Sequence, residues 1–506
     1  QNFEGLIHDG YVYVDKTAQI YELFNTNKYY FLSRPRRFGK SLLLSTLEAY
    51  AQGKKELFKG LALEKLEKDW TVYPVLHLDL NTQKYDTPES LTNVLEENVQ
   101  NWEVLYGASS SEIGVARRFQ GIIRRACEQT GRRVVILIDE YDKPMLQAIG
   151  NKELQNSFRE TLKAFYGALK SKDGCIKFAM LTGVTKFGKV SVFSDLNNLD
   201  DISMWNEYIE LCGISEKEIH KNLETELHEF ADVQKMTYDS FCEKLRQYYD
   251  GYHFTHNSIG MYNPFSLLNA FKRKEFGSYW FETGTPTYLV ELLKRHHYNL
   301  ERMAHEETNA QVLNSIDSES TSPIPVIYQS GYLTIKGYDE EFGIYHLGFP
   351  NKEVEEGFIQ FLVPYYTSMN NVESPFEIQK FVREIRSGDY NSFFQRLQSF
   401  FADTTYEIIR EQELHYENVL FIIFKLVGFY VKVEYHTSRG RIDLVLQTDK
   451  FIYIMEFKLN GTAEEALQQI NDKHYALPFE TDGRRLFKIG VNFSAETRNI
   501  EKWIVE

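Results

Sequence analysis

Short hydrophobic runs alternate with stretches of helical periodicity through the first two hundred residues of the chain. The runs are rich in β-branched and aromatic side chains, which is typical of buried strands. Strands that alternate with helices predict a parallel sheet with helices packed against it. The expected strands are Tyr29–Ser33, Val75–Leu80, Val134–Ile138 and Lys177–Thr182.

The pattern changes near residue 213 and again near residue 370. Between these points it is mostly helical and aromatic, with a hairpin expected near Gly331–Tyr345 that would suit a winged helix. The last part predicts an α-β-β-β-α-β order, with helices Phe376–Ser399 and Glu411–Leu426, strands Val431–Tyr435, Arg441–Gln447 and Phe451–Leu459, helix Ala463–Ala476 and strand Phe487–Phe493. We therefore expect an α/β protein with domains at 1–213, 214–370 and 371–506.

Charge and cysteine content narrow the classes of function. The 506 residues include 57 basic and 72 acidic side chains, a net charge of −15, which argues against a protein that coats nucleic acid through a uniformly basic surface. From Phe376 onward the charge is nearly balanced, with 17 basic and 20 acidic residues. The sequence is therefore compatible with a weak, metal-assisted and salt-sensitive contact between this part and nucleic acid. Four separated cysteines suggest neither a zinc site nor a disulfide framework, and the longest apolar run, Val419–Val431, is too short to span a membrane. A cytoplasmic protein is expected.

A phosphate-binding loop is predicted after the first strand. The sequence from Arg34 to Ser41 reads Arg-Pro-Arg-Arg-Phe-Gly-Lys-Ser and leads into a helical segment. In such a loop backbone N–H groups surround phosphate oxygens, Lys40 would neutralise the β and γ groups, and Ser41 would bind Mg²⁺. The usual first glycine is replaced by Arg34, and a chance Gly-Lys-Ser is the alternative. The residues expected at the nucleotide are Arg37, Phe38, Gly39, Lys40, Ser41 and Leu42.

The third expected strand ends in two acids, where a parallel sheet gathers its ligand-binding residues. Asp139 would hold Mg²⁺ through water, and Glu140 would orient and deprotonate the attacking water. Thr182, at the tip of the next strand, is a candidate sensor of the γ-phosphate, and Lys186 or Lys189 is a candidate cationic trigger. A capped strand end with solvated lysines is the alternative reading of that segment.

A second candidate site lies in the C-terminal strands. If Asp449-Lys450 forms a two-residue turn, Asp443 lies directly across from Glu456, and Lys458 projects from the same face. Two close carboxylates with a lysine suit Mg²⁺-dependent phosphodiester hydrolysis, with a surface salt bridge as the alternative. Asp443 and Glu456 are the expected metal ligands; Glu413 is a candidate third ligand, and Gln469 is an auxiliary catalytic candidate.

Together these segments resemble a bacterial family that joins an AAA-ATPase-like domain to a C-terminal nuclease-like domain of the PD-(D/E)xK superfamily. The resemblance rests on Tyr13–Thr17, Arg34–Ser41, Ile138–Asp142, Thr182–Val184, Gly440–Asp443 and Glu456–Lys458. It implies an AAA-like P-loop domain and a restriction-endonuclease-like domain. It also implies that family members share the arginine found here at position 34 in place of the usual first glycine. It implies further that Asp15, Lys16 and Thr17 lie near the adenine.

Two functions follow as predictions. The first is an ATP-hydrolysing protein that controls a metal-dependent nuclease acting on DNA or RNA, with ATP and Mg²⁺ as cofactors and Mn²⁺ an option at the nuclease site. The second is a nucleotide-dependent switch in signalling or defence whose nuclease-like domain binds a partner or nucleic acid without cleaving it. An ATPase with no nucleic-acid role is a third, weaker reading. A homo-oligomer is compatible with the sequence, and no membrane partner is expected.

Overall fold

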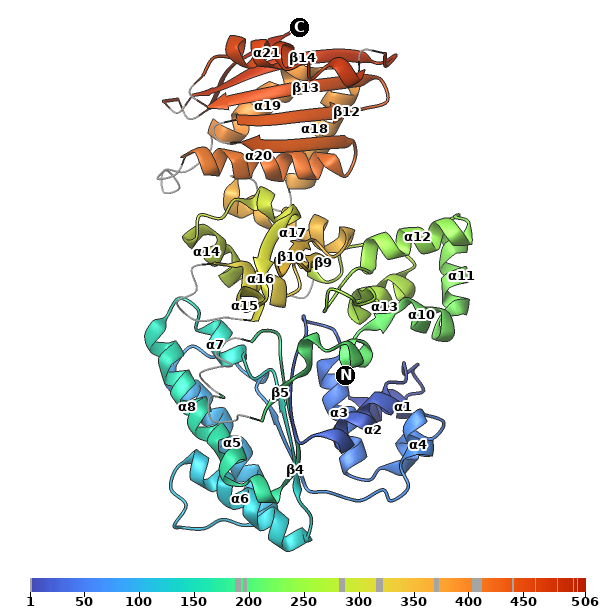
Figure 1. Ribbon diagram of the computed structural model, residues 1–506, viewed down its shortest axis with the longest axis vertical. Helices are drawn as coiled ribbons and strands as arrows, with labels where there is room; N and C mark the ends of the chain where they lie inside the picture. The colour runs from blue at the N-terminus through green and yellow to red at the C-terminus, as the bar shows by residue number, and fades with distance from the viewer. Residues whose placement is uncertain are drawn as a thin grey trace. The chain divides into compact units, whose positions relative to one another are not determined.

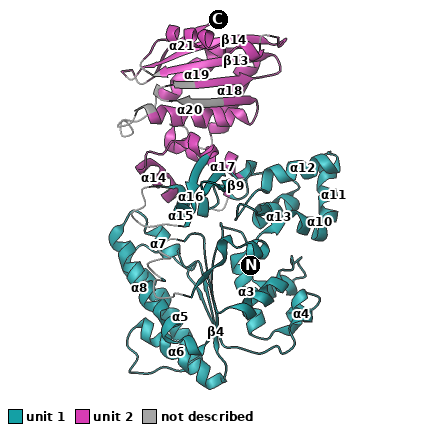
Figure 2. Ribbon diagram, in the orientation of Figure 1, with its two compact units in different colours: residues 1–280, 306–353 teal, residues 281–305, 354–506 magenta. Residues whose placement is uncertain are grey.

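The chain forms two compact units (Figure 2). The computed structural model describes residues 2–186, 193, 198–281, 287–314, 322–367, 373–402, 412–438, 441–459, 461–479, 481–494, 496–497 and 499–506. Unit 1 comprises Gln1–Trp280 and Glu306–Glu353, and unit 2 comprises Phe281–His305 and Val354–Glu506. The chain therefore passes between the units three times, and the division into three consecutive domains stays a prediction.

A five-stranded parallel sheet forms the centre of the N-terminal part of unit 1 (Figure 1). Its order is β2-β3-β4-β1-β5, so β4 lies between the strand before the phosphate loop and the strand with the acidic end. The strands are β1 Tyr29–Ser33, β2 Val75–Asp79, β3 Val134–Asp139, β4 Ile176–Gly183 and β5 Asp200–Asp201. The four predicted strands and the parallel α/β fold are confirmed.

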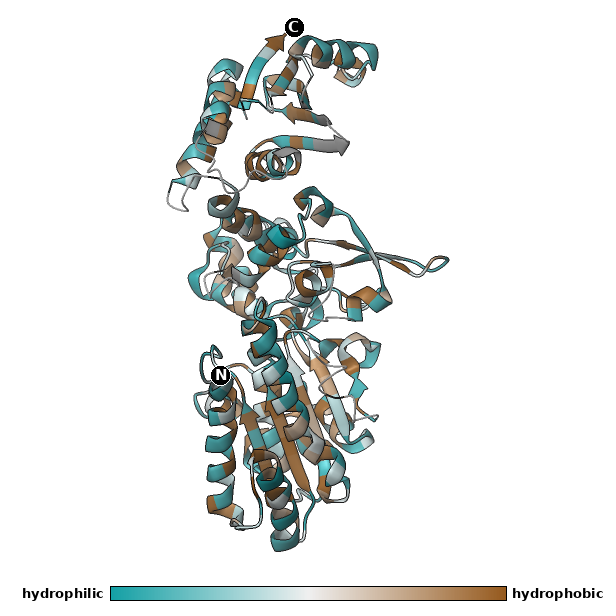
Figure 3. Ribbon diagram, turned by 90° about the vertical axis from the view of Figure 1, so that its left-hand side faces the viewer, coloured by the Kyte–Doolittle hydropathy of each residue, from teal (hydrophilic) through white to brown (hydrophobic). Residues whose placement is uncertain are grey.

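Helices cover both faces of this sheet (Figure 1). The side chains of β1 and β3 are buried on both faces, as expected for a central parallel strand, and the strands appear as hydrophobic ribbons in Figure 3. The helices are α1 Phe3–His8, α2 Thr17–Thr26, α3 Lys40–Ala51, α4 Ala62–Leu66, α5 Pro88–Tyr106, α6 Val115–Thr130, α7 Lys143–Gln147 and α8 Lys152–Ser171, with short turns η1 Lys55–Phe58, η2 Asp173–Cys175, η3 Ile202–Met204 and η4 Asn206–Leu211.

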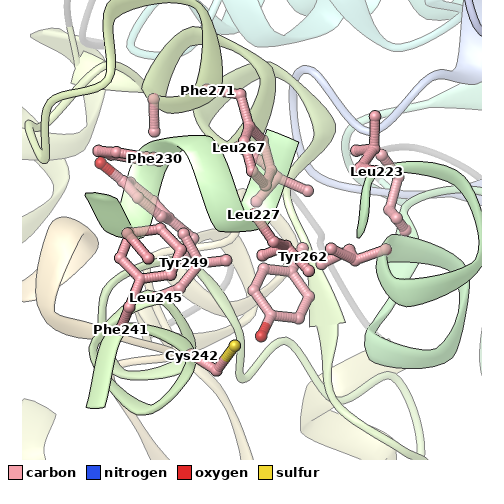
Figure 4. Close-up of a cluster of buried hydrophobic side chains, with 14 of the residues drawn as sticks. Leu223, Leu227, Phe230, Phe241, Cys242, Leu245, Tyr249, Tyr262, Leu267 and Phe271 are labelled. Carbon is pink, nitrogen blue, oxygen red and sulfur yellow. The ribbon is translucent and has the colours of Figure 1, made fainter. Parts of the chain in front are cut away.

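Residues 214–273 of unit 1 are mostly helical and aromatic. Helices α10 Glu216–Asn222, α11 Glu224–Val233, α12 Tyr238–Tyr249 and α13 Pro264–Arg273 follow a two-residue strand β6 Ile214–Ser215, which pairs with β7 Met261–Tyr262. Their apolar faces meet in one buried cluster (Figure 4) that includes Phe230, Phe241, Tyr249 and Phe271. Burial of such large rings, roughly 150–250 Å² each, accounts for the aromatic composition of the segment.

The predicted hairpin is present as β9 Thr334–Asp339 and β10 Ile344–Gly348. A third antiparallel strand, β8 Glu306–Asn309, joins the other edge of β10. Two short helices complete this part, α15 Ala310–Asn314 and α16 Ile324–Gln329. A winged helix built on this hairpin stays a prediction.

Unit 2 contains a five-stranded sheet of order β11-β12-β13-β14-β15, in which only β13 and β14 run parallel among the described pairs. The strands are β11 Lys432–Ser438, β12 Arg441–Gln447, β13 Phe451–Leu459, β14 Arg485–Ser494 and β15 Asn499–Val505. The helices are α14 Thr287–Arg295, α17 Lys352–Tyr366 (which begins at the end of unit 1), α18 Ser374–Ser387, α19 Tyr390–Ala402, α20 Gln412–Gly428 and α21 Ala463–Asp472, with turns η6 Leu300–Ala304 and η8 Leu477–Phe479.

Three expectations for this unit were wrong in detail. The single helix predicted over Phe376–Ser399 is two helices, because Gly388 and Asp389 separate α18 from α19. The helix predicted to reach Ala476 ends at Asp472, and β15 follows the strand that was expected to be the last. Among the described residues no helix is both long and apolar enough to cross a membrane.

Candidate functional sites

The phosphate loop joins β1 to α3 at the carboxyl edge of the parallel sheet. Gly39 stands before the first residue of α3 with φ 95°, and a Cβ there would meet no other atom within 4 Å. Arg37 also has a positive φ, 68°. The open space at Gly39 and the N-terminus of a 12-residue helix, where N–H groups are unsatisfied, fit the cradle that phosphate oxygens require.

Lys40 places a buried positive charge inside this loop. Its ammonium Nζ lies 3.1 Å from the Arg34 carbonyl oxygen, 3.3 Å from that of Pro35 and 3.3 Å from Glu140 Oε1. Only 3% of the lysine side chain is exposed, against 20% for Glu140. A buried ammonium is stable only beside such acceptors, so the loop already holds the charge that would neutralise a phosphate.

The ends of β3 and β4 bring the acidic residues beside this lysine. Asp139 is buried at the end of β3, and Thr182 Oγ1 donates a 2.6 Å hydrogen bond to its Oδ1. Glu140 follows with φ 54°, a conformation that costs a non-glycine residue energy and is found often at functional sites. Ser41 is exposed at the start of α3. The structure thus gathers the predicted lysine, acids and threonine at one sheet edge.

Asp142 belongs to the same network, although no role was predicted for it from the sequence. It is fully buried, and its carboxylate accepts hydrogen bonds from the backbone N–H of Val184 at 3.2 Å and of Thr185 at 2.6 Å. The Thr185 hydroxyl donates a third at 2.7 Å. Burial, together with the nearby charge of Glu140, raises the pKa of Asp142 to about 6. Asp142 therefore ties the end of β3 to the end of β4.

Arg34, at the position of the usual first glycine, has a structural role. Its guanidinium donates to the carbonyl oxygens of Ser33, Ser203 and Tyr208 at 3.0, 2.7 and 3.2 Å. It also lies 4.0 Å from the centre of the Phe254 ring, and burial lowers the pKa of Arg34 to about 10. The arginine thus fastens the start of the loop to residues outside it.

The side chains of Arg37, Phe38 and Leu42 differ in burial. The Phe38 ring is fully buried, with ring centres 4.8 Å from Tyr252 and 5.4 Å from Phe254. Arg37 is exposed, and its guanidinium lies over the Phe265 ring at 4.7 Å. Leu42 is half-buried in the first turn of α3.

The residues expected near the adenine already have partners within unit 1. Asp15 Oδ1 accepts hydrogen bonds from the N–H and hydroxyl of Thr17, and Oδ2 accepts one from the N–H of Ala62. Lys16 Nζ lies 2.5 Å from Glu218 Oε1. Asp15 thus joins the starts of α2 and α4, and its role at the nucleotide stays a prediction.

The ammonium group of the candidate trigger Lys186 is bound to Asp201 and Asn314. Its Nζ lies 2.8 Å from Asp201 Oδ2 and 2.6 Å from Asn314 Oδ1, and the lysine is 5% exposed. Together with Arg34 at the start of the phosphate loop, it also lines a small pocket. Lys189 lies outside the described residues.

At the second site, strands β12 and β13 pair in the register that a two-residue turn at Asp449-Lys450 predicts. Asp443 of β12 pairs directly with Glu456 of β13. Asp449 and Lys450 form the two-residue turn, which is closed by the N–H of Thr448 donating to the Phe451 carbonyl oxygen at 2.8 Å. The two carboxylates therefore stand side by side on one face of the sheet.

The environments of these side chains differ. Glu456 is fully buried, whereas Asp443 and Lys458 are half-buried. The Tyr475 hydroxyl lies 3.5 Å from Asp443 Oδ2, at the long limit of a hydrogen bond. Tyr475 was not expected at this site, because the sequence placed it inside a helix.

Helix α21 covers the face that carries Glu456. Ile470 of α21 packs with Ile452 and Ile454 of β13 in a buried cluster. The helix lies very close to β14 at Gly490, the strand partner of Glu456, because a Cβ there would overlap the Ala463 carbonyl oxygen and the Leu467 nitrogen. A glycine in the strand thus lets the helix seal the carboxylate from that side.

The auxiliary candidates are only partly described. Gln469 is half-buried on α21. Glu413 lies in α20, but its side chain is outside the described part of the chain. Within the described residues no group of three or more His, Cys, Asp or Glu is placed to hold a metal ion. The paired carboxylate oxygens of Asp443 and Glu456 are nevertheless the donors that Mg²⁺ and Mn²⁺ prefer.

Comparison with known proteins agrees with this combination of a phosphate-loop sheet and a carboxylate hairpin. Residues 1–193 match a family described as a predicted AAA-ATPase, and residues 411–503 match the PD-(D/E)XK nuclease superfamily. The chain is 34% identical over 513 residues to a protein of Azotobacter chroococcum mcd 1 described as "Uncharacterized protein in vnfD 5'region", covering 98% of this chain and 96% of the relative. The chain belongs to this family, which joins an AAA-ATPase-like domain to a PD-(D/E)XK nuclease superfamily domain.

Proposed function

We propose that this protein binds and hydrolyses ATP and thereby controls a metal-dependent site that cleaves phosphodiester bonds in DNA or RNA. The observation that carries the proposal is the pairing of Asp443 with Glu456 on a chain that also holds the buried Lys40–Glu140 pair beside Asp139. A cytoplasmic location, three domains and a possible self-association belong to the same proposal.

In the ATPase half, the backbone N–H groups of residues 37–42 and the Lys40 ammonium would hold the phosphates. Ser41 and Asp139 would hold Mg²⁺, and Thr182 would orient Asp139 through its 2.6 Å hydrogen bond. Glu140 would position a water molecule and take its proton. Its 3.3 Å contact with Lys40 would give way when a phosphate takes the lysine as its partner.

In the nuclease half, Asp443 and Glu456 would hold Mg²⁺ or Mn²⁺, with Glu413 a candidate third ligand and Gln469 an auxiliary group. A divalent metal at such a site supplies charge stabilisation to a phosphodiester. Lys458, on the same face as Glu456, would add a positive charge beside the reacting phosphate or help to deprotonate water. Tyr475 would orient Asp443 through its hydroxyl.

A cleavage assay tests the proposal. The protein is incubated with single- and double-stranded DNA and RNA and with Mg²⁺ or Mn²⁺, with and without ATP. Asp443→Ala should abolish cleavage, and Lys40→Ala should abolish its response to ATP. Asp449→Ala, in the exposed turn of the same hairpin, is the matched control and should cleave as the wild type does. Absence of metal-dependent cleavage on every substrate would refute the nuclease half.

A nucleotide-dependent switch whose nuclease-like domain binds without cleaving is the second candidate. The net charge of −15 favours it, because an acidic protein attracts nucleic acid weakly. If Lys40→Ala removes a cellular phenotype that Asp443→Ala leaves intact, the switch is the better description.

A further inference from the structure

Two side chains from the helical part of unit 1 donate hydrogen bonds to one carbonyl group of the phosphate loop. The Arg36 carbonyl oxygen accepts from Asn263 Nδ2 at 3.1 Å and from Trp280 Nε1 at 3.2 Å. A trans peptide group carries its C=O and the following N–H on opposite sides, and no cis peptide is present in the described chain. Anchoring the Arg36 carbonyl therefore fixes the direction in which the Arg37 N–H points.

Both donors are themselves held in place. Asn263 is fully buried, and its Oδ1 accepts from the N–H groups of Phe265 and Ser266 at 3.0 and 3.2 Å, which sets the orientation of the amide. Trp280 is 6% exposed, and its ring centre lies 5.0 Å from that of Tyr332. A movement of the loop at Arg36 must therefore move these groups or break their hydrogen bonds.

Trp280 also connects the loop to two points at which the chain leaves unit 1. Unit 1 ends its first segment at Trp280 and its second at Glu353. A hydrogen bond joins these two terminal residues: the backbone N–H of Trp280 donates to Glu353 Oε1 at 2.9 Å. Glu353 is fully buried near the start of α17, a helix that continues into unit 2.

We propose that Trp280 is a positioning residue that holds the phosphate loop and transmits its nucleotide state to the two chain crossings at Trp280 and Glu353. This inference rests on the proposed control of the nuclease-like site by ATP and names the residue through which that control passes. A shift of the 36–37 peptide on phosphate binding displaces the Trp280 indole through its hydrogen bond to the Arg36 carbonyl. The displaced Trp280 backbone then moves Glu353 through the hydrogen bond between them. The coupling is reciprocal, so the state of the crossings also alters ATP affinity.

Two variants separate this role from packing. Trp280→Phe keeps an aromatic ring but loses the N–H donor. Asn263→Asp keeps the oxygen that caps α13 but replaces the donor by an acceptor. Trp205→Phe, at a tryptophan that is 43% exposed, is the matched control.

ATP binding by calorimetry, intrinsic fluorescence and ATP-dependent cleavage are measured for each variant. We expect Trp280→Phe and Asn263→Asp to weaken ATP binding about fivefold. The ratio of cleavage with ATP to cleavage without ATP should fall toward one in both. A fluorescence change on ATP addition that comes from the Trp280 indole should persist in Trp205→Phe and disappear in Trp280→Phe, which shows that this indole senses the nucleotide, while ATP affinity and the cleavage ratio report its positioning role.

The outcomes distinguish this inference from the proposed function. If the wild type binds ATP and responds to it while Trp280→Phe shows the same affinity, fluorescence change and cleavage ratio, the positioning role is overturned and the proposed function stands. If the wild type binds no ATP by calorimetry, the proposed function itself fails, and the positioning role fails with it.

Discussion

Substitution of Gly490 by alanine should selectively loosen the PD-(D/E)XK domain. The added methyl carbon would lie 2.9 Å from Leu467 Cβ and closer still to the Ala463 carbonyl oxygen and the Leu467 nitrogen. Carbon atoms prefer separations of about 3.5–4.0 Å, so α21 has to retreat from β14 by roughly an ångström. Two of the obstructing atoms belong to the helix backbone and cannot rotate away.

The expected cost is about 2–3 kcal/mol, at the upper end of what an inserted methyl group costs in a packed core. This corresponds to a roughly 30- to 150-fold larger population of the opened domain. Hydrogen exchange read by mass spectrometry should therefore accelerate by up to that factor in peptides that cover α21 and β14. Peptides from the N-terminal parallel sheet should exchange as in the wild type.

Gly428→Ala provides the control in the same unit. Gly428 is the exposed last residue of α20, and a Cβ there would be 3.5 Å from Val433, an ordinary contact. Its effect should stay within about 0.5 kcal/mol. If Gly490→Ala leaves exchange in α21 unchanged, the close approach of the helix to the sheet does not limit the stability of this domain, and the reasoning is wrong.

Three further changes test the sites. Lys40→Ala should lower ATP turnover by about 100-fold or more, measured as phosphate release, because it removes the cation of the loop; unchanged turnover contradicts this. Asp142 has a folded-state pKa of about 6, above the ordinary value of 3.8, so it favours the folded state at low pH and loses this contribution as the pH rises from about 4 to 6. Over that range the unfolding free energy of the wild type should fall with pH more steeply than that of Asp142→Asn, by up to about 1.4 kcal/mol per pH unit. Parallel plots of unfolding free energy against pH would refute this. Tyr475→Phe should reduce metal-dependent cleavage by roughly three- to tenfold without changing the unfolding midpoint, and full activity would rule out a role for the hydroxyl near Asp443.

Features fixed by local periodicity could be read from the sequence. A two-residue turn and the period of two along a strand determine which residues face each other. Once the turn was assumed at Asp449-Lys450, the pairing of Asp443 with Glu456 followed from the residue numbers. The parallel strands were readable for a similar reason, because their continuous apolar runs have a clear beginning and end.

Features set by tertiary packing could not be read in this way. Tyr475 was expected on a helix, but α21 ends at Asp472 and His474 takes a positive φ of 55°, which ends the helical course before the residue that reaches Asp443. Asp142 resembles a helix-capping residue in sequence. Its burial depends on β4, whose end supplies the donors for its carboxylate from more than 40 positions away.

The threefold passage of the chain between the units affects how the protein can be made. Residues 281–305 belong with segments synthesised much later, because Asn418 accepts a hydrogen bond from the Leu300 N–H at 2.8 Å and donates one to the Tyr298 carbonyl oxygen at 3.1 Å. At about 5–20 residues per second, a ribosome needs on the order of ten seconds to bridge that interval. Meanwhile residues 306–353 emerge and can complete unit 1. During translation, residues 281–305 must therefore stay outside folded unit 1 until the rest of unit 2 has been synthesised.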